Sequence, residues 1–572
     1  MKKTLAMGLG AMLAVGAAGQ ASAASQIDFS GYYRVYSMTD VNLGRQTEDA
    51  SFTDSYWGSR LNIDLTFHAT DELEVSWRMR APHFKRWGSG ADNRSGIDLG
   101  TYHVYGLIKQ DWGNVYIGRL DEDLDVYGLA TLGYLPETNP VWTTVGPFEE
   151  AGVFDGVRYV NEWDNGFALM AQYAKVDNNG GDSIGANADG QGRPLNFHSD
   201  QDYDQYLVEA AYKWDGGGVS LGAIYERDAT TYDGTDNAAF NAFYLNPAFM
   251  QTWGDFSVHF EGKAGWGKAD GLYRGVSDDK AEGYAAYLDF DYNYGPGNVT
   301  LAGWYASGTG LDELYKSGDA KSKSLVSMGG NFLPLIVAYN DASSGYGRVG
   351  HSSYAQANGI ESNSNAISLA NNAFANYVAD GRSNFTALNN GIDLQTLAGG
   401  GGTSWFAFNV LSNMFGAQNR TSSLNEGTEA NHWAVAVSGN QTLTDDISMH
   451  YALAYLALAK PNYRVATRST YHTAMNADGA NWYNNSYKEQ DKDMGFEIDL
   501  GFSFQLLDNL QFTTAFGYMF TGDAYKTMKG YNVRKGAGNT NMTGIQDGDS
   551  IQAVWKDGDD AYTWYNTLTF SF

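Results

Sequence analysis

Apolar and polar residues alternate along much of the chain. In 61–67 every odd position is apolar and every even position is polar, and a second alternating run covers 73–80 after a turn at 68–72. Successive side chains of a strand point to opposite faces, so each run predicts a strand with one apolar and one polar face. Such strands suit a closed barrel with lipid outside and water inside.

The same pattern recurs as hairpins to the end of the sequence. Eight hairpins, with single strands at 27–38 and 561–572, predict an all-β, transmembrane antiparallel β-barrel of about 18 strands. A count of 16 or of 20 is the alternative, the latter if 325–339 and 405–415 form one more hairpin. The other expected hairpins are 101–110 with 115–120, 154–163 with 166–176, 203–213 with 219–228, 239–252 with 256–268, 283–293 with 299–307, 431–442 with 447–459, and 494–505 with 510–520.

Short and long connections between the expected strands alternate. Short periplasmic turns and long external loops give this alternation, so both ends of the barrel chain are expected on the periplasmic side. In the longest connection, 308–430, apolar residues from Ile367 to Val378 fall at helical spacing, which predicts either a short helix or an open loop. The segments expected as external loops are 39–56, 83–97, 121–152, 177–202, 308–430, 460–491 and 522–559.

The first residues have the pattern of an export signal. Lys2 and Lys3 precede an apolar run, and Ala21-Ser22-Ala23 offers a cleavage site. The expected division is therefore a signal peptide at 1–23 and a single barrel domain at 24–572, located in the bacterial outer membrane.

Composition excludes several classes of function. The chain has no cysteine, which rules out thiol chemistry and cysteine-bound metals. Its net charge of -29 disfavours nucleic acid as a partner. It has neither a phosphate-binding loop nor a helix-spaced histidine pair, and Asp177 to Asp182 do not match a calcium loop. We therefore expect no cofactor and no metal site.

Two stretches resemble the general porins of Gram-negative bacteria. The segment 104–121 is similar to a porin strand that turns through a Trp-Gly pair into a Gly-Arg strand end, and 155–173 is similar to the hairpin that follows. The chain also ends W-Y-N-T-L-T-F-S-F, which resembles the terminal strand read by the barrel-assembly machinery, with Phe572 as the signal. The resemblance implies a homotrimer that contacts outer-membrane lipid and lipopolysaccharide, and compact Gly31 and Ser37 are weak support for close packing between barrels.

The resemblance also implies a constriction. In general porins the loop between these two segments folds into the barrel, which assigns 121–152 that role here. A solvated external loop is the alternative. The acidic side of the constriction would consist of Asp121, Glu122, Asp123, Asp125, Glu149 and Glu150.

Opposite such a loop, general porins place arginines on the barrel wall. Strand alternation offers inward candidates, because a basic side chain facing lipid costs about 2–4 kcal/mol near the midplane. A simple salt bridge to Asp64 or Glu74 is the alternative for any one of them, and Arg119 stays open because its parity with Val115 and Ile117 turns it outward. The candidates are Arg34, Arg60, Arg78, Arg80 and Arg158.

These patterns favour a porin that lets small hydrophilic solutes and ions diffuse passively, with a preference for cations because acidic residues predominate. About 18 strands and a very long loop keep a channel selective for a sugar, an organic acid or a polysaccharide as the alternative. A barrel enzyme that uses His432, His450 and His472 is a remote alternative, because no nucleophile motif accompanies them. We expect no enzymatic activity.

Overall fold

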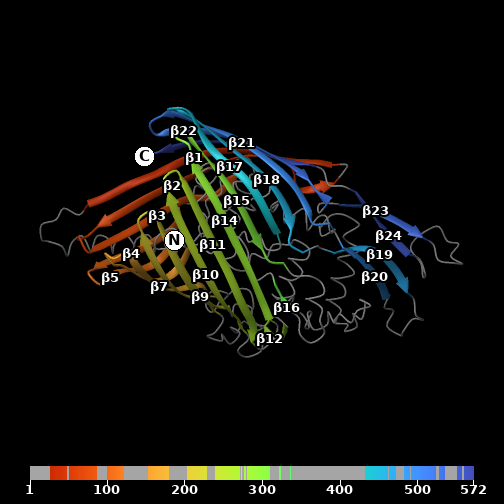
Figure 1. Cartoon of the computed structure of the whole chain (residues 1–572), viewed down its shortest axis with the longest axis horizontal. Helices are drawn as coiled ribbons and strands as arrows, with labels where there is room; N and C mark the ends of the chain where they lie inside the picture. Colours follow the sequence, from red (N-terminus) through yellow and green to blue (C-terminus); the bar gives the residue numbers. More distant parts are fainter. Residues whose placement is uncertain are drawn as a thin grey trace, which may run out of the picture.

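The protein folds into a closed ring of antiparallel strands in the computed structural model (Figure 1). None of the described residues forms a helix long and apolar enough to cross a membrane. The expected signal peptide, the helix at 367–378 and most of 121–152 lie outside the described residues. The structure describes residues 26–47, 50–86, 100–121, 153–178, 202–228, 239–270, 272–273, 276–277, 280–308, 321–323, 335, 432–460, 463–471, 482–489, 491–523, 527–534, 550–556 and 560–572.

Eighteen strands form the barrel, which confirms the expected number. The ring closes because β1 (Gln26–Thr47) pairs with β2 (Ala50–His68) on one side and with β25 (Ala561–Ser571) on the other. A further short strand, β16 (Lys321–Ser322), pairs in parallel with β14, and β12 (Leu272–Tyr273) pairs with β13 (Val276–Ser277) apart from the ring. The remaining barrel strands are β3 (Leu73–Arg86), β4 (Gly100–Gln110), β5 (Gly113–Asp121), β6 (Val153–Glu162), β7 (Phe167–Asn178), β8 (Asp202–Trp214), β9 (Gly217–Asp228), β10 (Ala239–Trp253), β11 (Phe256–Asp270), β14 (Lys280–Asn293), β15 (Gly297–Ala306), β17 (His432–Thr444), β18 (Ile447–Leu458), β21 (Asp493–Leu507) and β22 (Leu510–Thr521).

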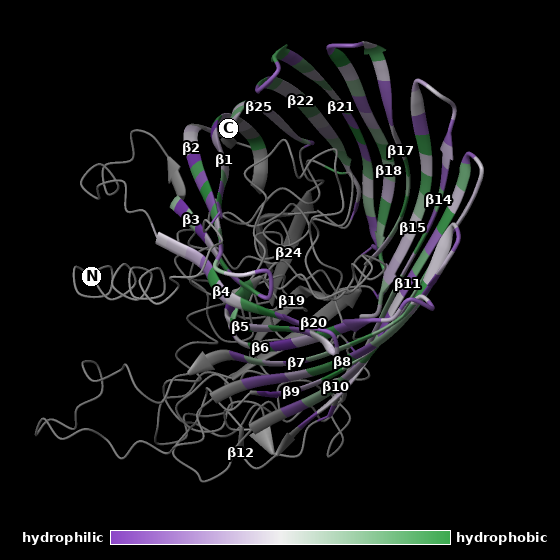
Figure 2. Ribbon diagram, turned by 90° about the vertical axis from the view of Figure 1, so that its left-hand side faces the viewer, coloured by the Kyte–Doolittle hydropathy of each residue, from purple (hydrophilic) through white to green (hydrophobic). Residues whose placement is uncertain are grey.

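Alternation sorts the side chains into an outer and an inner wall. On β21 the residues Phe496, Ile498 and Leu500 are exposed, whereas Glu497 and Asp499 between them are buried. Hydrophilic and hydrophobic residues also alternate along other barrel strands (Figure 2), and many of their large apolar residues are exposed, which gives an apolar outer wall. This is the arrangement of a strand whose two faces meet different environments.

Tight turns join the strands at one end of the barrel. In the turn after β6, Gly166 has a φ of 84° and donates its backbone N–H to the carbonyl of Trp163 at 2.9 Å. A side chain would be strained at this φ, so glycine fits the turn. The expected short turns are therefore confirmed at this end.

The C-terminal residue belongs to the seam where the barrel closes. Phe572 and Gly31 exchange two backbone hydrogen bonds of 2.9 and 3.0 Å, and the Phe572 ring stacks on Phe29 with 5.4 Å between ring centroids. A Cβ on Gly31 would lie 2.9 Å from the Phe572 Cζ atom. Ser37 accepts a hydrogen bond from Asn566 of β25 at 3.2 Å. Both compact positions therefore serve the seam within one chain, which removes their support for packing between chains.

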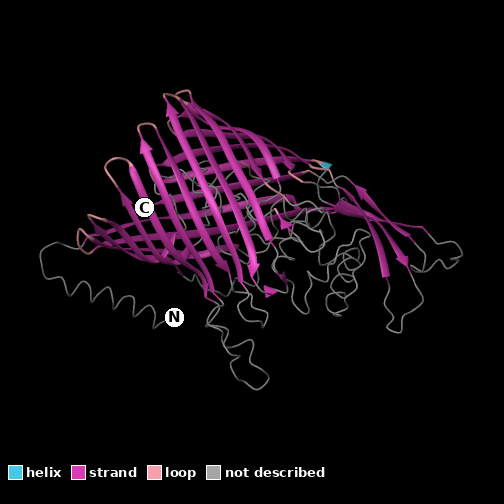
Figure 3. Ribbon diagram, turned by 60° about the horizontal axis from the view of Figure 1, so that its bottom comes forward, coloured by secondary structure: helices cyan, strands magenta, loops and turns pink. Residues whose placement is uncertain are grey.

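Strands extend into several of the expected external loops, such as β3 into 83–97 and β16 into 308–430. The segment 39–56 is mostly the continuation of β1 and β2, and only residues 48–49 of it lie outside the description. The segments 460–491 and 522–559 hold β19 (Tyr463–Tyr471), β20 (Trp482–Glu489), β23 (Thr527–Arg534) and β24 (Ser550–Lys556). These four form a separate sheet beyond the barrel end that lies away from the tight turns (Figure 3).

Candidate channel lining

Three arginines lie side by side on the inner wall of β1 to β3. Arg34 and Arg60 are Cα partners across β1 and β2, and Arg80 lies on β3, where its Nε donates to the Asn62 Oδ1 atom at 3.1 Å. All three side chains are buried. Neutral groups are among their partners, because Arg34 Nε donates to the Thr569 hydroxyl at 3.1 Å and the Arg80 guanidinium lies 3.7 Å from the centroid of the Tyr102 ring. An aromatic face stabilises a guanidinium without cancelling its charge.

The other two predicted arginines also lie on the inner wall. Arg78 donates from Nε to the Asp64 Oδ1 atom at 2.6 Å, the salt bridge that was the alternative for this residue. Arg158, on β6, donates from Nε to the Gln172 Oε1 atom at 2.9 Å. These residues extend a basic arc from β1 to β6, which we define as Arg34, Arg60, Arg78, Arg80 and Arg158.

Carboxylates line the inner wall from β8 to β14, and two more, Glu497 and Asp499, are buried on β21, which is separated from β1 by β22 and β25. Glu209 and Glu261 are buried on the inner wall, and Asn246 Nδ2 donates to the Glu261 Oε1 atom at 3.0 Å. Asp291 accepts hydrogen bonds from Thr300 at 2.6 Å and Asn298 at 2.9 Å. We define this acidic arc as Glu209, Glu226, Glu261, Asp289 and Asp291. Basic side chains lie among these residues, such as Lys263 over the Tyr244 ring and His259, whose Nδ1 lies 3.4 Å from the Asp289 Oδ2 atom.

Strands β1–β3, which carry the three buried arginines, lie across the barrel from β11 and β14, whereas Arg158 on β6 and Glu209 on β8 are only two strands apart. In the ring, β11 is the ninth strand from β2, and Figure 2 shows β1–β3 and β11–β15 on opposite sides. Opposite charges on opposing walls produce a field across the space between them, and low-dielectric walls strengthen it. A dipolar or ionic solute between the arcs would be oriented by this field.

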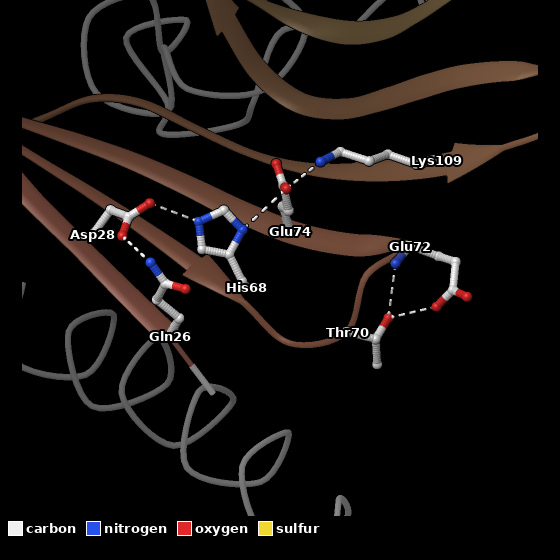
Figure 4. Close-up of polar contacts among 7 residues, drawn as sticks. All are labelled: Gln26, Asp28, His68, Thr70, Glu72, Glu74 and Lys109. Atoms are coloured by element: carbon white, nitrogen blue, oxygen red, sulfur yellow. Dashed lines mark hydrogen bonds and ion pairs between the residues drawn. The ribbon is translucent and has the colours of Figure 1, made fainter. Parts of the chain in front are cut away.

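A mixed cluster occupies the inner wall near the tight turns (Figure 4). His68 contacts Asp28 through Nε2 at 2.9 Å and Glu74 through Nδ1 at 3.0 Å, and Glu74 also forms an ion pair with Lys109. Gln26 donates to Asp28 at 2.9 Å. Positive and negative groups are paired here, so this end of the wall contributes little net field.

Most residues of the predicted acidic constriction are not described by the structure. Asp121 is the last residue of β5, while Glu122, Asp123, Asp125, Glu149 and Glu150 lie outside the described residues. Arg119, which the sequence left open, faces outward and forms an ion pair with Asp155 at 3.0 Å. Its parity with Ile117 therefore decides its direction.

The two described histidines of the remote enzyme alternative, His432 and His450, do not lie together. His432 pairs with Leu458 in the β17–β18 register, and His450 pairs with Asn440, eight residues along β18. That offset is roughly 26 Å at 3.3 Å per residue. His450 also contacts the Asn440 amide and the Ser503 hydroxyl, and His472 lies outside the described residues.

The acidic arc was missed in the sequence, although its signal is present. Glu209 shares the parity of Leu207 and Ala211, which are buried, and Tyr206 and Val208 beside it are exposed. The alternation that selected the arginines would have selected Glu209 by the same rule. Among the described residues, no group of three or more histidine, aspartate or glutamate side chains could hold a metal ion.

Comparisons with known proteins give neighbours in structure only. No family model matches the chain, and no curated protein matches it. A BenF-like porin of Pseudomonas fluorescens is similar at a TM-score of 0.44 and 9% identity, covering 96% of this chain and 98% of its own. OpdK of Pseudomonas aeruginosa, solved with vanillate, gives 0.42 and 10% over 96% and 99%, and the outer-membrane protein OmpT of Vibrio cholerae gives 0.34 and 12% over 96% and 100%. The functional argument therefore rests on the geometry of this chain's own barrel.

Proposed function

We propose that the chain is a bacterial outer-membrane channel through which small hydrophilic solutes and ions diffuse passively. The observation that carries the proposal is the closed barrel with an apolar outer wall and two opposed arcs of charge inside. A closed ring satisfies the backbone groups without a sheet edge, and an apolar exterior suits lipid. Charged inner walls suit a path for water and solutes.

A preference for cations follows from the acidic excess. The chain has a net charge of -29, and the inner wall buries carboxylates such as Glu209 and Glu261. Carboxylates in a narrow space bounded by low-dielectric walls raise the local concentration of cations. The acidic residues of 121–152 would add to this effect if that loop forms the constriction that the porin resemblance implies.

Single-channel recording in planar bilayers tests both statements. Wild type should conduct, and its zero-current potential in a salt gradient should report cation preference. The variant D121N/E122Q/D123N/D125N should move that potential toward anions while conductance persists. D445N/D446N/D508N, at the tight turns, is a matched control expected to change it little. Absence of conductance would overturn the channel, and anion preference in wild type would overturn the selectivity.

A second candidate is a channel selective for small organic acids. The buried row of Arg34, Arg60 and Arg80 favours it, because guanidinium groups bind carboxylates with good geometry. In that case a panel of carboxylates should block the ion current at millimolar concentration, while neutral sugars should not. R60Q should weaken this block, and K213Q, near the tight turns, should retain it.

We also propose that the channel is a homotrimer, on the sequence resemblance to general porins alone. Native mass measurement in detergent should give three chains per particle. One chain per particle would contradict the proposal without affecting the channel function.

A further inference from the structure

A β-bulge in β4 turns two consecutive side chains toward the inside of the barrel. In the β3–β4 register Arg78 pairs with His103. The next residue, Met79, pairs with Thr101, so Tyr102 is the extra residue of the bulge. Regular alternation would turn Tyr102 outward, because His103 beside it faces inward, yet both side chains are buried and Thr101 is exposed. A bulge re-aims a side chain in this way, and here it adds a tyrosine to the inner wall.

The ring of Tyr102 lies against an arginine of the basic arc. The guanidinium carbon of Arg80 is 3.7 Å from the centroid of the ring, and both side chains are buried. An aromatic face attracts a guanidinium group and leaves its charge unchanged. Without the bulge the ring would belong to the outer wall, so the bulge gives Arg80 its aromatic contact.

Asn62 also holds Arg80 and links it to Arg34. Asn62 is the register partner of Tyr32 on β1 and of Arg80 on β3. Its Oδ1 atom accepts a hydrogen bond from Arg80 Nε at 3.1 Å, and its Nδ2 atom donates to the Tyr32 hydroxyl at 2.9 Å. The Arg34 guanidinium lies 4.8 Å from the centroid of the Tyr32 ring. An amide has one acceptor end and one donor end, so these two hydrogen bonds fix its orientation at a buried position.

These contacts matter because the guanidinium groups of the row repel one another. Arg34 and Arg60 are Cα partners, and Arg80 lies on the next strand of the ring. An arginine held in one place also loses much rotamer freedom, so its position requires contacts that stabilise it. A carboxylate in place of Asn62 would hold Arg80 but would reduce its positive potential. A neutral amide and an aromatic ring hold the group and leave that potential intact.

We propose that Tyr102 and Asn62 are positioning residues of the channel, which hold the Arg80 guanidinium at a fixed place on the inner wall so that the arginine row can bind the carboxylate of a solute. The inference rests on the proposed function, in particular on its organic-acid candidate. Tyr102 acts through its ring and Asn62 through its neutral amide. Position and charge can therefore be changed separately.

Replacements at Tyr102 change the position of Arg80 without changing any charge. In Y102L, Arg80 should react with phenylglyoxal, a reagent for arginine, at least about fivefold faster than in wild type, because the guanidinium has lost the ring that held it. Succinate should block the ion current about fivefold more weakly for the same reason, while the zero-current potential in a salt gradient should stay close to wild type. Y102F keeps the ring and should behave like wild type in all three measurements. Peptide mass mapping measures the reaction at Arg80.

Replacements at Asn62 change charge and position in the opposite combination. N62D still accepts a hydrogen bond from Arg80, so Arg80 should react with phenylglyoxal as slowly as in wild type. Its zero-current potential should shift toward cations about as far as that of R80Q, because both changes lower the local charge by one unit. N62L removes the acceptor without adding a charge, so Arg80 should react faster and the potential should stay close to wild type.

Y105L is the matched control for the loss of a tyrosine. Tyr105 lies on the inner wall of the same strand, with its ring 5.4 Å from the ring of His103 and 5.7 Å from that of Tyr116. Its replacement should leave the reactivity of Arg80 and the block by succinate close to wild type. Heat-modifiable migration of each variant shows separately that the barrel is assembled.

Unchanged reactivity of Arg80 in Y102L, or an increase in Y102F as large as that in Y102L, would overturn the role of the ring. A wild-type zero-current potential in N62D would overturn the role of the neutral amide. Absence of conductance in wild type would instead contradict the proposed channel, and conductance that succinate does not block would contradict the organic-acid candidate. The reaction of Arg80 with phenylglyoxal measures its positioning by Tyr102 in either case.

Discussion

The outer and inner walls of the barrel are made by the same strands but follow different rules. On the outer wall, Leu500, Phe516 and Leu568 lie on three different strands and have the same apolar character. On the inner wall, Arg60 and Glu261 occupy equivalent inward positions and have opposite charge. Lipid imposes one chemistry on every outward position, whereas the interior allows each strand its own. Differences between barrels of this kind are therefore expected inside, where solutes pass.

The largest effect on stability should follow from placing a charged side chain, of the kind found on the inner wall, on the outer wall. Leu500 is exposed at the middle of β21. L500R should lower the free energy of unfolding by about 2–4 kcal/mol, because a charge then faces the centre of the bilayer. Urea unfolding in lipid vesicles measures the change, with L500V as the control. A loss below about 1 kcal/mol would mean that this part of the outer wall does not face lipid.

A smaller loss should follow from filling space at the seam. G31A places a Cβ 2.3 Å from the backbone oxygen of Asn62 on β2 and 2.9 Å from the Phe572 ring, and overpacking of this kind costs about 1–3 kcal/mol. A Cβ added at Gly106, which lies on the same wall, would have no atom within 4 Å. G106A is therefore the matched control. The temperature of the gel-mobility shift should fall for G31A and stay close to wild type for G106A.

Deletion of Phe572 should reduce the amount of assembled barrel. An unchanged amount of assembled barrel would contradict the role of Phe572 as the assembly signal.

The sequence predicts the outer wall better than the inner wall. Lipid enforces a strict alternation, and for that reason the strand number and the tight turns were predicted correctly. The strands β19 and β23 were missed because a register shift at Ala466 and another at Lys529 interrupt the alternation. Periodicity could not find the role of Gly31 either, because this role depends on Phe572, more than 500 residues away in the chain.

The inner wall was predicted in direction but not in pattern. Parity turns Arg34 and Arg60 inward, and their burial in the structure follows from it. The opposition between arginines and Glu261 depends on which strands face each other, and this requires the closed ring. A local sequence pattern does not show which strands face each other across the barrel.

Neutralising the two arcs should move ion selectivity in opposite directions. R34Q/R60Q/R80Q should favour cations, and E209Q/E261Q/D289N should favour anions. A unit charge about 10 Å away contributes about 0.4 kcal/mol in water, so three changes alter the local concentration of a monovalent cation roughly fivefold to tenfold, and that of an anion by a similar factor in the opposite direction. The zero-current potential in a salt gradient measures both. Shifts of the same sign would contradict the opposed arcs.

The smallest effect should come from Arg78 of the basic arc, which forms a salt bridge with Asp64 on the same side of the barrel. Arg78 and Asp64 are both partly exposed, so their salt bridge contributes less than about 1 kcal/mol to stability. D64N removes a negative charge beside Arg78 and should shift selectivity toward anions about twofold. R78Q should shift it toward cations by a similar amount, and D64N/R78Q should return close to wild type, because the pair is nearly neutral as a unit. A D64N effect as large as that of R34Q/R60Q/R80Q would contradict this account, because a charge that is paired with Arg78 would then determine the selectivity of the pore as strongly as the three buried arginines.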